Sequence, residues 1–349
     1  MAEEVMRYTA TYLKSIADAA SQVKGVGSLV GKRVLITGCN GLICSAVTDM
    51  LLCMNSNMDA RISIYAASRS RSRTAKRFGE YSRQDCFTFV DYDATKPFGF
   101  DDDVDFIIHG AGNADPAAIM LQPVETMTAN ISGTGQLLQY AARHKGCRLL
   151  YISSSEVYGK KASAEPYKET DYGFVDLLNP RSCYPSSKRA AETLCASYAK
   201  EYGTDAVIVR PGHIYGPTMT ATDSRASSEF ARLAMAGKDI RMKTPGNQLR
   251  SYCYVADCAS ALLTVMAKGT TGNAYNISNS KSIVTIRRMA QAFADAAGCR
   301  VVTEGATQAQ LAAYNMMDNS SLDSSKIEAL GWKALTTMSQ GARMTIAQE

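Results

Sequence analysis

Histidine is scarce in this 349-residue chain, and its ten cysteines include no C-x-x-C pair. The three histidines (His109, His144 and His213) are not spaced as a ligand pair, so the sequence predicts no metal site. The thiols are scattered through apolar or helical stretches, which indicates reduced cysteines of a cytoplasmic protein rather than a disulfide framework.

Long apolar runs and a strong charge of one sign are also absent. No stretch approaches the length of a membrane span, and the chain begins MAEEVMRY, with acidic residues where a signal peptide would carry bases. The net charge is +5 and charged residues make up 20%. This balance is unlike that of a nucleic-acid binder, although it suits an anionic small molecule.

Short apolar strands alternate with helices between residues 31 and 212. Strands are expected at 33–37, 61–66, 86–90, 105–109, 148–153 and 206–210, and helices at 42–54, 71–78, 124–143 and 186–202. The alternation predicts an α/β fold, a Rossmann-like doubly wound parallel sheet with helices on both faces.

The chain on either side of this segment has a different pattern. Residues 1–30 are expected to form an N-terminal extension with a helix over roughly 4–22. Beyond Gly212 the alternation loosens, with helices near 224–236, 255–267 and 284–296. We expect residues 213–349 to form mainly a smaller substrate-binding lobe, and part of this segment could be interleaved with the sheet.

The turn TGCNGLIC (37–44) follows the first strand and opens a helix. Gly38 and Gly41 lack a Cβ and would let the backbone approach a pyrophosphate, whose charge would lie at the helix N-terminus. Cys44 stands where a third glycine is usual, which predicts a local shift in helix–strand packing. A strand–helix turn without a ligand is the alternative.

The end of the second strand, AASR (66–69), has no acidic residue to bind the ribose 2′-hydroxyl of NAD. The hydroxyl of Ser68 and the guanidinium of Arg69 suit a 2′-phosphate, so NADP is favoured modestly over NAD. A basic, solvated start of a helix is the alternative. Asp93 is predicted either to contact the adenine amine or to cap a turn.

Tyr184 and Lys188 are four residues apart at the start of a helix and therefore share a face. The ammonium is expected to lower the pKa of the tyrosine toward the working pH, so that Tyr184 could accept a proton from a substrate hydroxyl. Ser154, at the end of a central strand, could donate a hydrogen bond to the same oxygen. Together with the glycine turn upstream, this arrangement predicts a hydride-transfer enzyme.

A series of motifs resembles those of the extended short-chain dehydrogenase/reductases, in particular the nucleotide-sugar epimerases, dehydratases and decarboxylases. The motifs run from about residue 31 to 340 and are TGCNGLIC, IIHGAG (107–112), NISGTGQLL (130–138), SSSEVYG (153–159), NPRSCYPSSKRAAE (179–192), RPGHIYGP (210–217), RSYCYVADC (250–258) and LGW (330–332). The resemblance implies that Ser154, Tyr184 and Lys188 form the catalytic trio. It also implies a supporting Asn130 and a homodimer formed through the helix at 124–143 and the helix that carries Tyr184.

The predicted cofactor site comprises Gly38, Asn40, Gly41, Leu42, Ile43, Ser68, Arg69, Tyr92, Asp93, Gly110, Ala111, Gly112, Asn130, Ser153, Tyr184, Lys188, Pro211 and His213. The predicted substrate site comprises Ser155, Glu156, His213, Arg225 and Arg250. The resemblance implies that the two arginines contact the ribose or diphosphate of a nucleotide sugar, and that His213 replaces an asparagine common near the diphosphate.

Members of this family share oxidation of the sugar C4 hydroxyl to a ketone and differ in the next step. Ser155 stands where 4,6-dehydratases carry an aspartic acid, which disfavours dehydration. The Ser155–Glu156 pair and the NPRSCY motif resemble UDP-glucuronate decarboxylases most, with Glu156 as a further catalytic residue. Those enzymes carry an arginine for the substrate carboxylate, however, and the stretch 314–326 has none.

Three other functions therefore stay open at this point. A 4-epimerase needs only ketone formation, rotation of the sugar and reduction. A net NADPH-dependent carbonyl reductase would use the same trio, and a non-catalytic dinucleotide-binding protein would usually have lost part of it.

Overall fold

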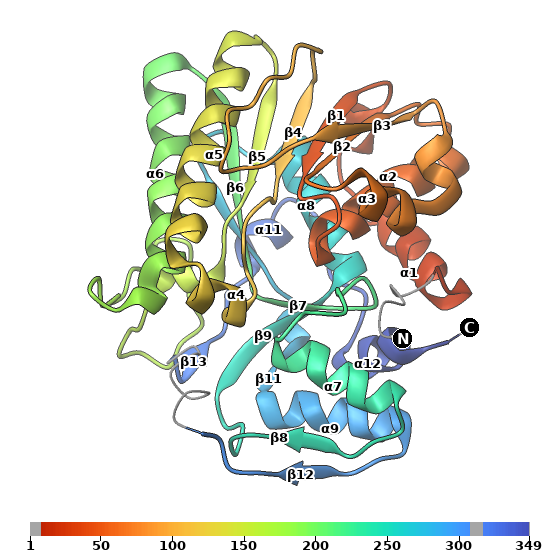
Figure 1. The fold of residues 1–349 in the computed structure, drawn as a ribbon, viewed down its shortest axis with the longest axis vertical. Coiled ribbons are helices and arrows are strands. Elements are labelled where there is room, and N and C mark those ends of the chain that lie inside the picture. The colour runs from red at the N-terminus through yellow and green to blue at the C-terminus, as the bar shows by residue number, and fades with distance from the viewer. Residues whose placement is uncertain (1–7, 308–316, 349) are drawn as a thin grey trace.

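The computed structural model describes residues 8–307 and 317–348, and its largest element is a parallel sheet of seven strands in the order β10-β6-β5-β4-β1-β2-β3 (Figure 1). The strands are β1 (Arg33–Thr37), β2 (Ser63–Ser68), β3 (Phe87–Asp91), β4 (Phe106–His109), β5 (Arg148–Ile152), β6 (Asp205–Pro211) and β10 (Ala274–Ile277). The strand order reverses between β1 and β4, which opens a crevice at their carboxyl ends. The predicted α/β, Rossmann-like sheet is confirmed.

Helices cover both faces of this sheet because its strands are apolar on both sides. Leu35 of β1 lies in a buried cluster with α5 (Pro123–Arg143) and α6 (Cys183–Tyr202). The next residue, Ile36, lies in a second cluster with α2 (Leu42–Met58) and α8 (Val255–Lys268). Successive side chains of a strand point to opposite faces, so the two helix pairs flank the sheet.

The remaining helices extend these layers. The helix α3 (Arg71–Phe78) connects β2 to β3, and α1 (Ala10–Ala20) packs on the outside of α2 and α8 (Figure 1). Within 8–307 and 317–348, no helix combines the length and the apolar character needed to cross a bilayer.

A smaller lobe lies at the carboxyl ends of the parallel strands, because β6 leads directly into it (Figure 1). It contains two small sheets. One consists of β7 (His213–Tyr215), β9 (Leu249–Tyr254), β11 (Ile283–Thr285) and β13 (Asn319–Ser320), and the other consists of β8 (Ile240–Met242) and β12 (Val301–Thr303). Its helices are α7 (Ala226–Met235), α9 (Ile286–Ala297) and α12 (Met338–Ile346), while α4 (Pro116–Leu121) and α11 (Ser325–Glu328) lie nearer the large sheet.

The chain beyond residue 212 serves both parts of the molecule. After forming β7, α7, β8 and β9 it returns as α8 and β10, and β10 pairs in parallel with β6 through Ala274 opposite Ile208. The large sheet is thus completed by chain that has already passed through the smaller lobe. The alternation pattern did not reveal β10, because this strand lies beyond residue 212, where the alternation loosens.

Candidate active site

Glycines bring the loops after β1 and β4 together at the crevice. Gly38 has φ +73°, and a Cβ there would lie 2.9 Å from the backbone nitrogen of Ala111. A Cβ on Gly112 would lie 2.9 Å from Oδ1 of Asn130 on α5. The positive φ and the backbone contact require glycine at Gly38, whereas the close atom at Gly112 is the end of a side chain.

The N-terminus of α2 is open toward this crevice. Gly41 is its N-cap and supplies no side-chain hydrogen bond, so the first-turn N–H groups that follow, beginning at Leu42 and Ile43, have no capping side chain. These groups and the positive end of the helix fit the pyrophosphate of a dinucleotide. Cys44 is 3% exposed and lies in the core between α2 and the sheet, so the thiol does not block the crevice.

Three polar side chains form a hydrogen-bonded triangle at the end of β2. Nδ2 of Asn40 donates to Oγ of Ser68 and to Oγ1 of Thr74, at 3.0 Å each, and the two hydroxyl oxygens are 2.9 Å apart. Oδ1 of Asn40 is buried without a partner in the described part of the chain. Arg69 follows this triangle and is exposed. In dinucleotide-binding sheets of this kind, the end of the second strand is the part that meets the ribose.

Two of the predicted cofactor residues have structural partners in the loop after β3. Oδ1 of Asp93 accepts hydrogen bonds from the backbone nitrogen and hydroxyl of Thr95, at 3.0 and 2.8 Å, and these bonds lower the pKa of the carboxyl. Asp93 therefore caps a turn, which was one of the two roles expected. Tyr92 is buried, with its ring 5.1 Å from that of Phe98.

Two further predicted residues lie at the ends of β5 and β6. The hydroxyl of Ser153 donates to Glu192 on α6 at 2.5 Å, and Glu192 forms an ion pair with Arg210 at 2.6 Å. Pro211 ends β6 opposite Ile277 of β10. The side chain of Ser153 thus stabilises the packing of α6 against the sheet.

Tyr184 lies in the first turn of α6, buried beside Ile119 and Cys183. Burial and the charge of Glu156 raise its pKa to about 12, against a lowering hydrogen bond from Ser154. The structure thus brings Ser154 and Tyr184 together.

Lys188 is buried one turn further along α6. Nζ donates to the carbonyl oxygen of Ile152 at 2.8 Å and lies 5.8 Å from the ring centre of Tyr184. Burial lowers the pKa of Lys188 to about 8. The pKa of Tyr184 is raised rather than lowered toward the working pH, because burial and a nearby carboxylate dominate.

An ion pair that was not predicted from the sequence lies beside the tyrosine. Oε1 of Glu156 accepts from a terminal nitrogen of Arg181 at 2.9 Å, and the backbone nitrogen of Glu156 donates to Oγ of Ser154 at 3.2 Å. Nε of Arg181 is buried without a partner in 8–307 and 317–348. The available signal was an arginine three residues before Tyr184 in NPRSCY. The neighbouring Ser155 is buried.

Asn130 connects the two long helices behind the tyrosine. Its Nδ2 donates to Oγ of Ser187 at 3.0 Å, and that hydroxyl donates to the carbonyl oxygen of Tyr184 at 3.1 Å. Oδ1 of Asn130 is fully buried and lacks a partner among the described residues. The side chain of Asn130 thus supports the first turn of α6, and its unpartnered Oδ1 lies next to Gly112.

Cationic groups of the smaller lobe face this site. Arg225, at the N-terminus of α7, is held by Asp223, and its charge acts on Tyr184. Arg250 is 3% exposed, and its acceptors in the described chain are the main-chain carbonyls of Leu249 at 2.9 Å and Asp318 at 3.5 Å. A buried guanidinium without a carboxylate partner fits an anionic ligand.

His213 begins β7, opposite Tyr252 of β9. Burial, Arg250 and Arg225 lower the pKa of His213 to about 3, so its imidazole is neutral near neutral pH. Its Nδ1 is buried without a partner in the part of the chain that the structure describes. In that same part, no three His, Cys, Asp or Glu residues are grouped as metal ligands would be.

Comparisons with known proteins identify the family of this chain. The model of the NAD dependent epimerase/dehydratase family matches residues 34–278. UDP-glucuronic acid decarboxylase 6 of Arabidopsis thaliana is 35% identical over 247 residues, which cover 71% of this chain and 69% of the relative. UDP-glucuronic acid decarboxylase 1 of Xenopus tropicalis is 29% identical over 336 residues, covering 95% and 76%.

Among solved structures, UDP-glucuronic acid 4-epimerase from Bacillus cereus, in complex with UDP-glucuronic acid and NAD, superposes with a TM-score of 0.75. It is 21% identical and covers 90% of this chain and 98% of its own, so it shows the shared fold. The matched family model spans the glycine turn, Ser154, Tyr184 and Lys188. The chain is an enzyme of the NAD-dependent epimerase/dehydratase family.

Proposed function

We propose that the protein acts on a nucleotide sugar through transient oxidation of C4 to a ketone, and that it decarboxylates UDP-glucuronate. The main support is the position of Tyr184, which lies beside Ser154, after the end of β5, within the electrostatic field of Arg225 from the smaller lobe. A sugar bound by its diphosphate to that lobe would present its hydroxyls to the tyrosine. The smaller lobe is accordingly proposed as the substrate-binding part.

The side chains have distinct roles in this proposal. When bound, the nicotinamide supplies a reversible hydride acceptor. Tyr184 accepts the proton of the C4 hydroxyl, and Ser154 donates a hydrogen bond to the same oxygen. In the resulting 4-keto acid the C5–C6 bond breaks, its electron pair passes to the C4 carbonyl oxygen and carbon dioxide leaves. A proton then returns to C5 and the ketone is reduced.

The choice of decarboxylation is supported by Glu156 and Arg181. Glu156 follows Ser154 by two residues and is held 2.9 Å from Arg181, so a carboxylate and a guanidinium stand next to the tyrosine. The two relatives described above by sequence are both named UDP-glucuronic acid decarboxylases. We infer that Glu156 takes part in the step that follows ketone formation.

A second candidate reaction is 4-epimerisation of the same class of substrate. It is favoured by one observation, the absence of arginine from the sequence stretch 314–326. Without a dedicated cation for the C6 carboxylate, the 4-keto sugar would rotate and be reduced on its other face rather than lose carbon dioxide.

Incubation of the purified protein with UDP-glucuronate tests both reactions. Decarboxylation gives carbon dioxide and a UDP-pentose, whereas epimerisation gives UDP-galacturonate. As a control, the absorbance of the reduced nicotinamide is measured at the end of the reaction, because neither of these two reactions consumes reduced cofactor. Stoichiometric consumption of NADPH would contradict both reactions and show a net carbonyl reductase.

We also propose a preference for NADP over NAD. Ser68, rather than an acidic residue, ends β2, and the exposed guanidinium of Arg69 follows it. A 2′-phosphate would find a cation there and no repelling carboxylate. Fluorescence titration with NADPH and NADH measures the preference, and tenfold tighter binding of NADH would reverse it.

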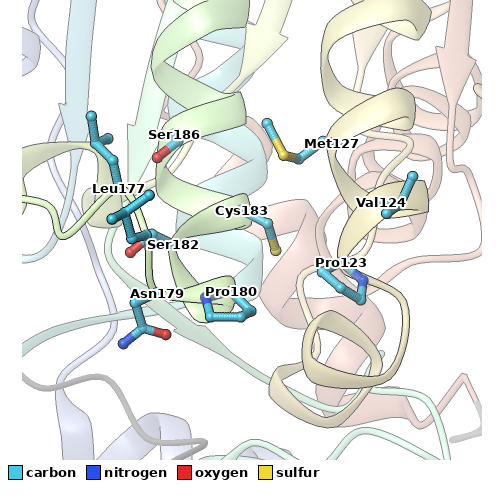
Figure 2. A pocket seen from close by; sticks show the side chains of 10 residues that line it. Pro123, Val124, Met127, Leu177, Asn179, Pro180, Ser182, Cys183 and Ser186 are labelled. Atoms are coloured by element: carbon cyan, nitrogen blue, oxygen red, sulfur yellow. The ribbon is translucent and has the colours of Figure 1, made fainter.

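A homodimer formed through α5 and α6 is the proposed assembly. The two helices lie side by side on one outer face, and apolar side chains surround a pocket of about 190 Å³ near their first turns (Figures 1 and 2). Val124 is 70% exposed, and Leu177 and Leu178 are 76% and 94% exposed. Sedimentation of wild type and Val124→Asp tests this assembly.

We also propose a cytoplasmic location for the protein, which its ten free thiols support.

A further inference from the structure

The helix α1 precedes the first strand of the fold, and its contacts indicate what it does. Tyr12 lies within α1 and Tyr8 lies just before it. Their hydroxyls donate to the two carboxylate oxygens of one residue, Asp49, at 2.6 Å from Tyr12 and 2.8 Å from Tyr8. Asp49 is on α2, the helix that begins at the glycine turn, and is 4% exposed.

The same carboxylate binds a second helix. A terminal nitrogen of Arg77, on α3, donates to Oδ2 of Asp49 at 2.5 Å, and the other terminal nitrogen donates to the hydroxyl of Tyr8 at 2.8 Å. The guanidinium also lies over the ring of Tyr8, 5.1 Å from its centre. Arg77 is 8% exposed, so both members of the ion pair are removed from water.

A buried ion pair is stable only when the remaining donors and acceptors find partners. Here Tyr8 and Tyr12 supply hydrogen bonds that Asp49 would otherwise lack. The N-terminal segment thus supplies the remaining partners of the Asp49 carboxylate in the bridge between α2 and α3, whereas Nε of Arg77 has no partner among the described residues.

Arg77 and one member of the hydrogen-bonded triangle at the end of β2, Thr74, lie on the same short helix. Thr74, one turn before Arg77 on α3, is 1% exposed and bonds both Ser68 and Asn40. A movement of α3 relative to α2 would therefore displace the hydrogen-bonded triangle at the end of β2.

We propose that Tyr8 and Tyr12 are positioning residues for the adenosine end of the dinucleotide. They fix Asp49 and Arg77, which hold α3 and with it Thr74, Asn40 and Ser68. The N-terminal segment then affects cofactor binding indirectly, through the position of α3. The inference concerns cofactor binding and holds for either of the reactions proposed above.

The test compares Tyr8→Phe/Tyr12→Phe with Ser15→Ala in the full-length protein. The double variant keeps both rings and removes only the hydroxyls that reach Asp49. Ser15 is a matched control because it is buried on the same helix, and its hydroxyl bonds the carbonyl of Tyr12 and approaches Tyr254 at 3.4 Å instead. The dissociation constants of NADPH and NADH are measured by fluorescence, and that of UDP by calorimetry.

We expect the dissociation constant of the preferred dinucleotide to rise about three- to tenfold in the double variant. The UDP constant should stay unchanged, and Ser15→Ala should leave all constants near those of wild type. Unchanged dinucleotide binding in a folded double variant would overturn the proposal. An equal loss of dinucleotide and UDP affinity would overturn it too, because it would show a general structural role. If the double variant does not fold, Tyr8→Phe alone is measured with the same criteria.

Discussion

Cys44 occupies the space that Gly110 leaves open, since a Cβ on Gly110 would lie 2.3 Å from Sγ of Cys44. Cys44 stands on α2 where a third glycine is usual, and Gly110 follows β4. The helix can therefore carry a thiol at this position because the neighbouring strand end has no side chain. The two residues form a matched pair across the helix–sheet contact.

This pair predicts coupled stability effects. Gly110→Ala should lower the free energy of unfolding by about 1–3 kcal/mol through overpacking. Cys44→Ala in the same chain should restore part of that loss, although it costs stability in the wild-type background. Urea unfolding of the four proteins gives the coupling energy, and additive losses would contradict the matched pair.

Removal of the Tyr184 hydroxyl tests its proposed role in proton transfer. Tyr184→Phe should reduce turnover about a hundred- to ten-thousandfold, because no other group replaces the proton acceptor. Dinucleotide affinity should stay intact. Tyr202→Phe, on the exposed end of the same helix, is the control. Unchanged turnover in Tyr184→Phe would exclude the tyrosine from the mechanism.

The charges beside Tyr184 predict opposite shifts of the pH–rate profile. Arg181 lowers the pKa of Tyr184 and Glu156 raises it. Arg181→Gln should therefore move the rise in activity to higher pH, because the deprotonated phenol forms less readily. Glu156→Gln should move the rise to lower pH, independently of any loss in maximal rate. Shifts of both variants in one direction would contradict this account.

His109 predicts acid sensitivity of the fold. It is 1% exposed at the end of β4, and burial and Lys188 lower its pKa to about 3 from an ordinary 6.5. The folded state keeps the imidazole neutral while the unfolded chain takes up a proton below 6.5. Stability is therefore complete above 6.5 and is lost as the pH falls toward 3, by about 1.4 kcal/mol per pH unit.

His109→Asn measures this contribution. Urea unfolding over that pH range should show a smaller loss of stability in the variant than in the wild type. His144→Asn is the control, because that ring is partly exposed. Parallel losses in wild type and His109→Asn would assign the acid sensitivity to other groups.

The order of elements and the glycine turn could be read from the sequence because both depend on local patterns. The strand at 33–37 and the helix at 71–78 have the predicted bounds. The helix that carries Tyr184 begins three residues earlier than predicted, at Cys183, because the 3-10 turn at Pro180–Ser182 runs straight into it. The N-terminal helix was expected from residue 4, and residues before 8 lie outside the described chain.

Partners distant in sequence could not be predicted in the same way. The pairing of Glu156 with Arg181 depends on how two loops meet at the sheet edge. The high pKa of Tyr184 depends on burial, which a four-residue spacing does not reveal. The bridge from Tyr12 to Asp49 joins residues 37 positions apart, and neither belongs to a motif.

The return of the chain to the large sheet as β10 makes the two parts of the molecule inseparable by a simple cut. A polypeptide ending at Gly212 would expose the full length of β6 as an edge strand, and the apolar residues that α8 covers would face water. Such a fragment would offer a template for aggregation rather than an autonomous dinucleotide-binding module. The first half of the protein is therefore protected from aggregation only after synthesis has reached β10.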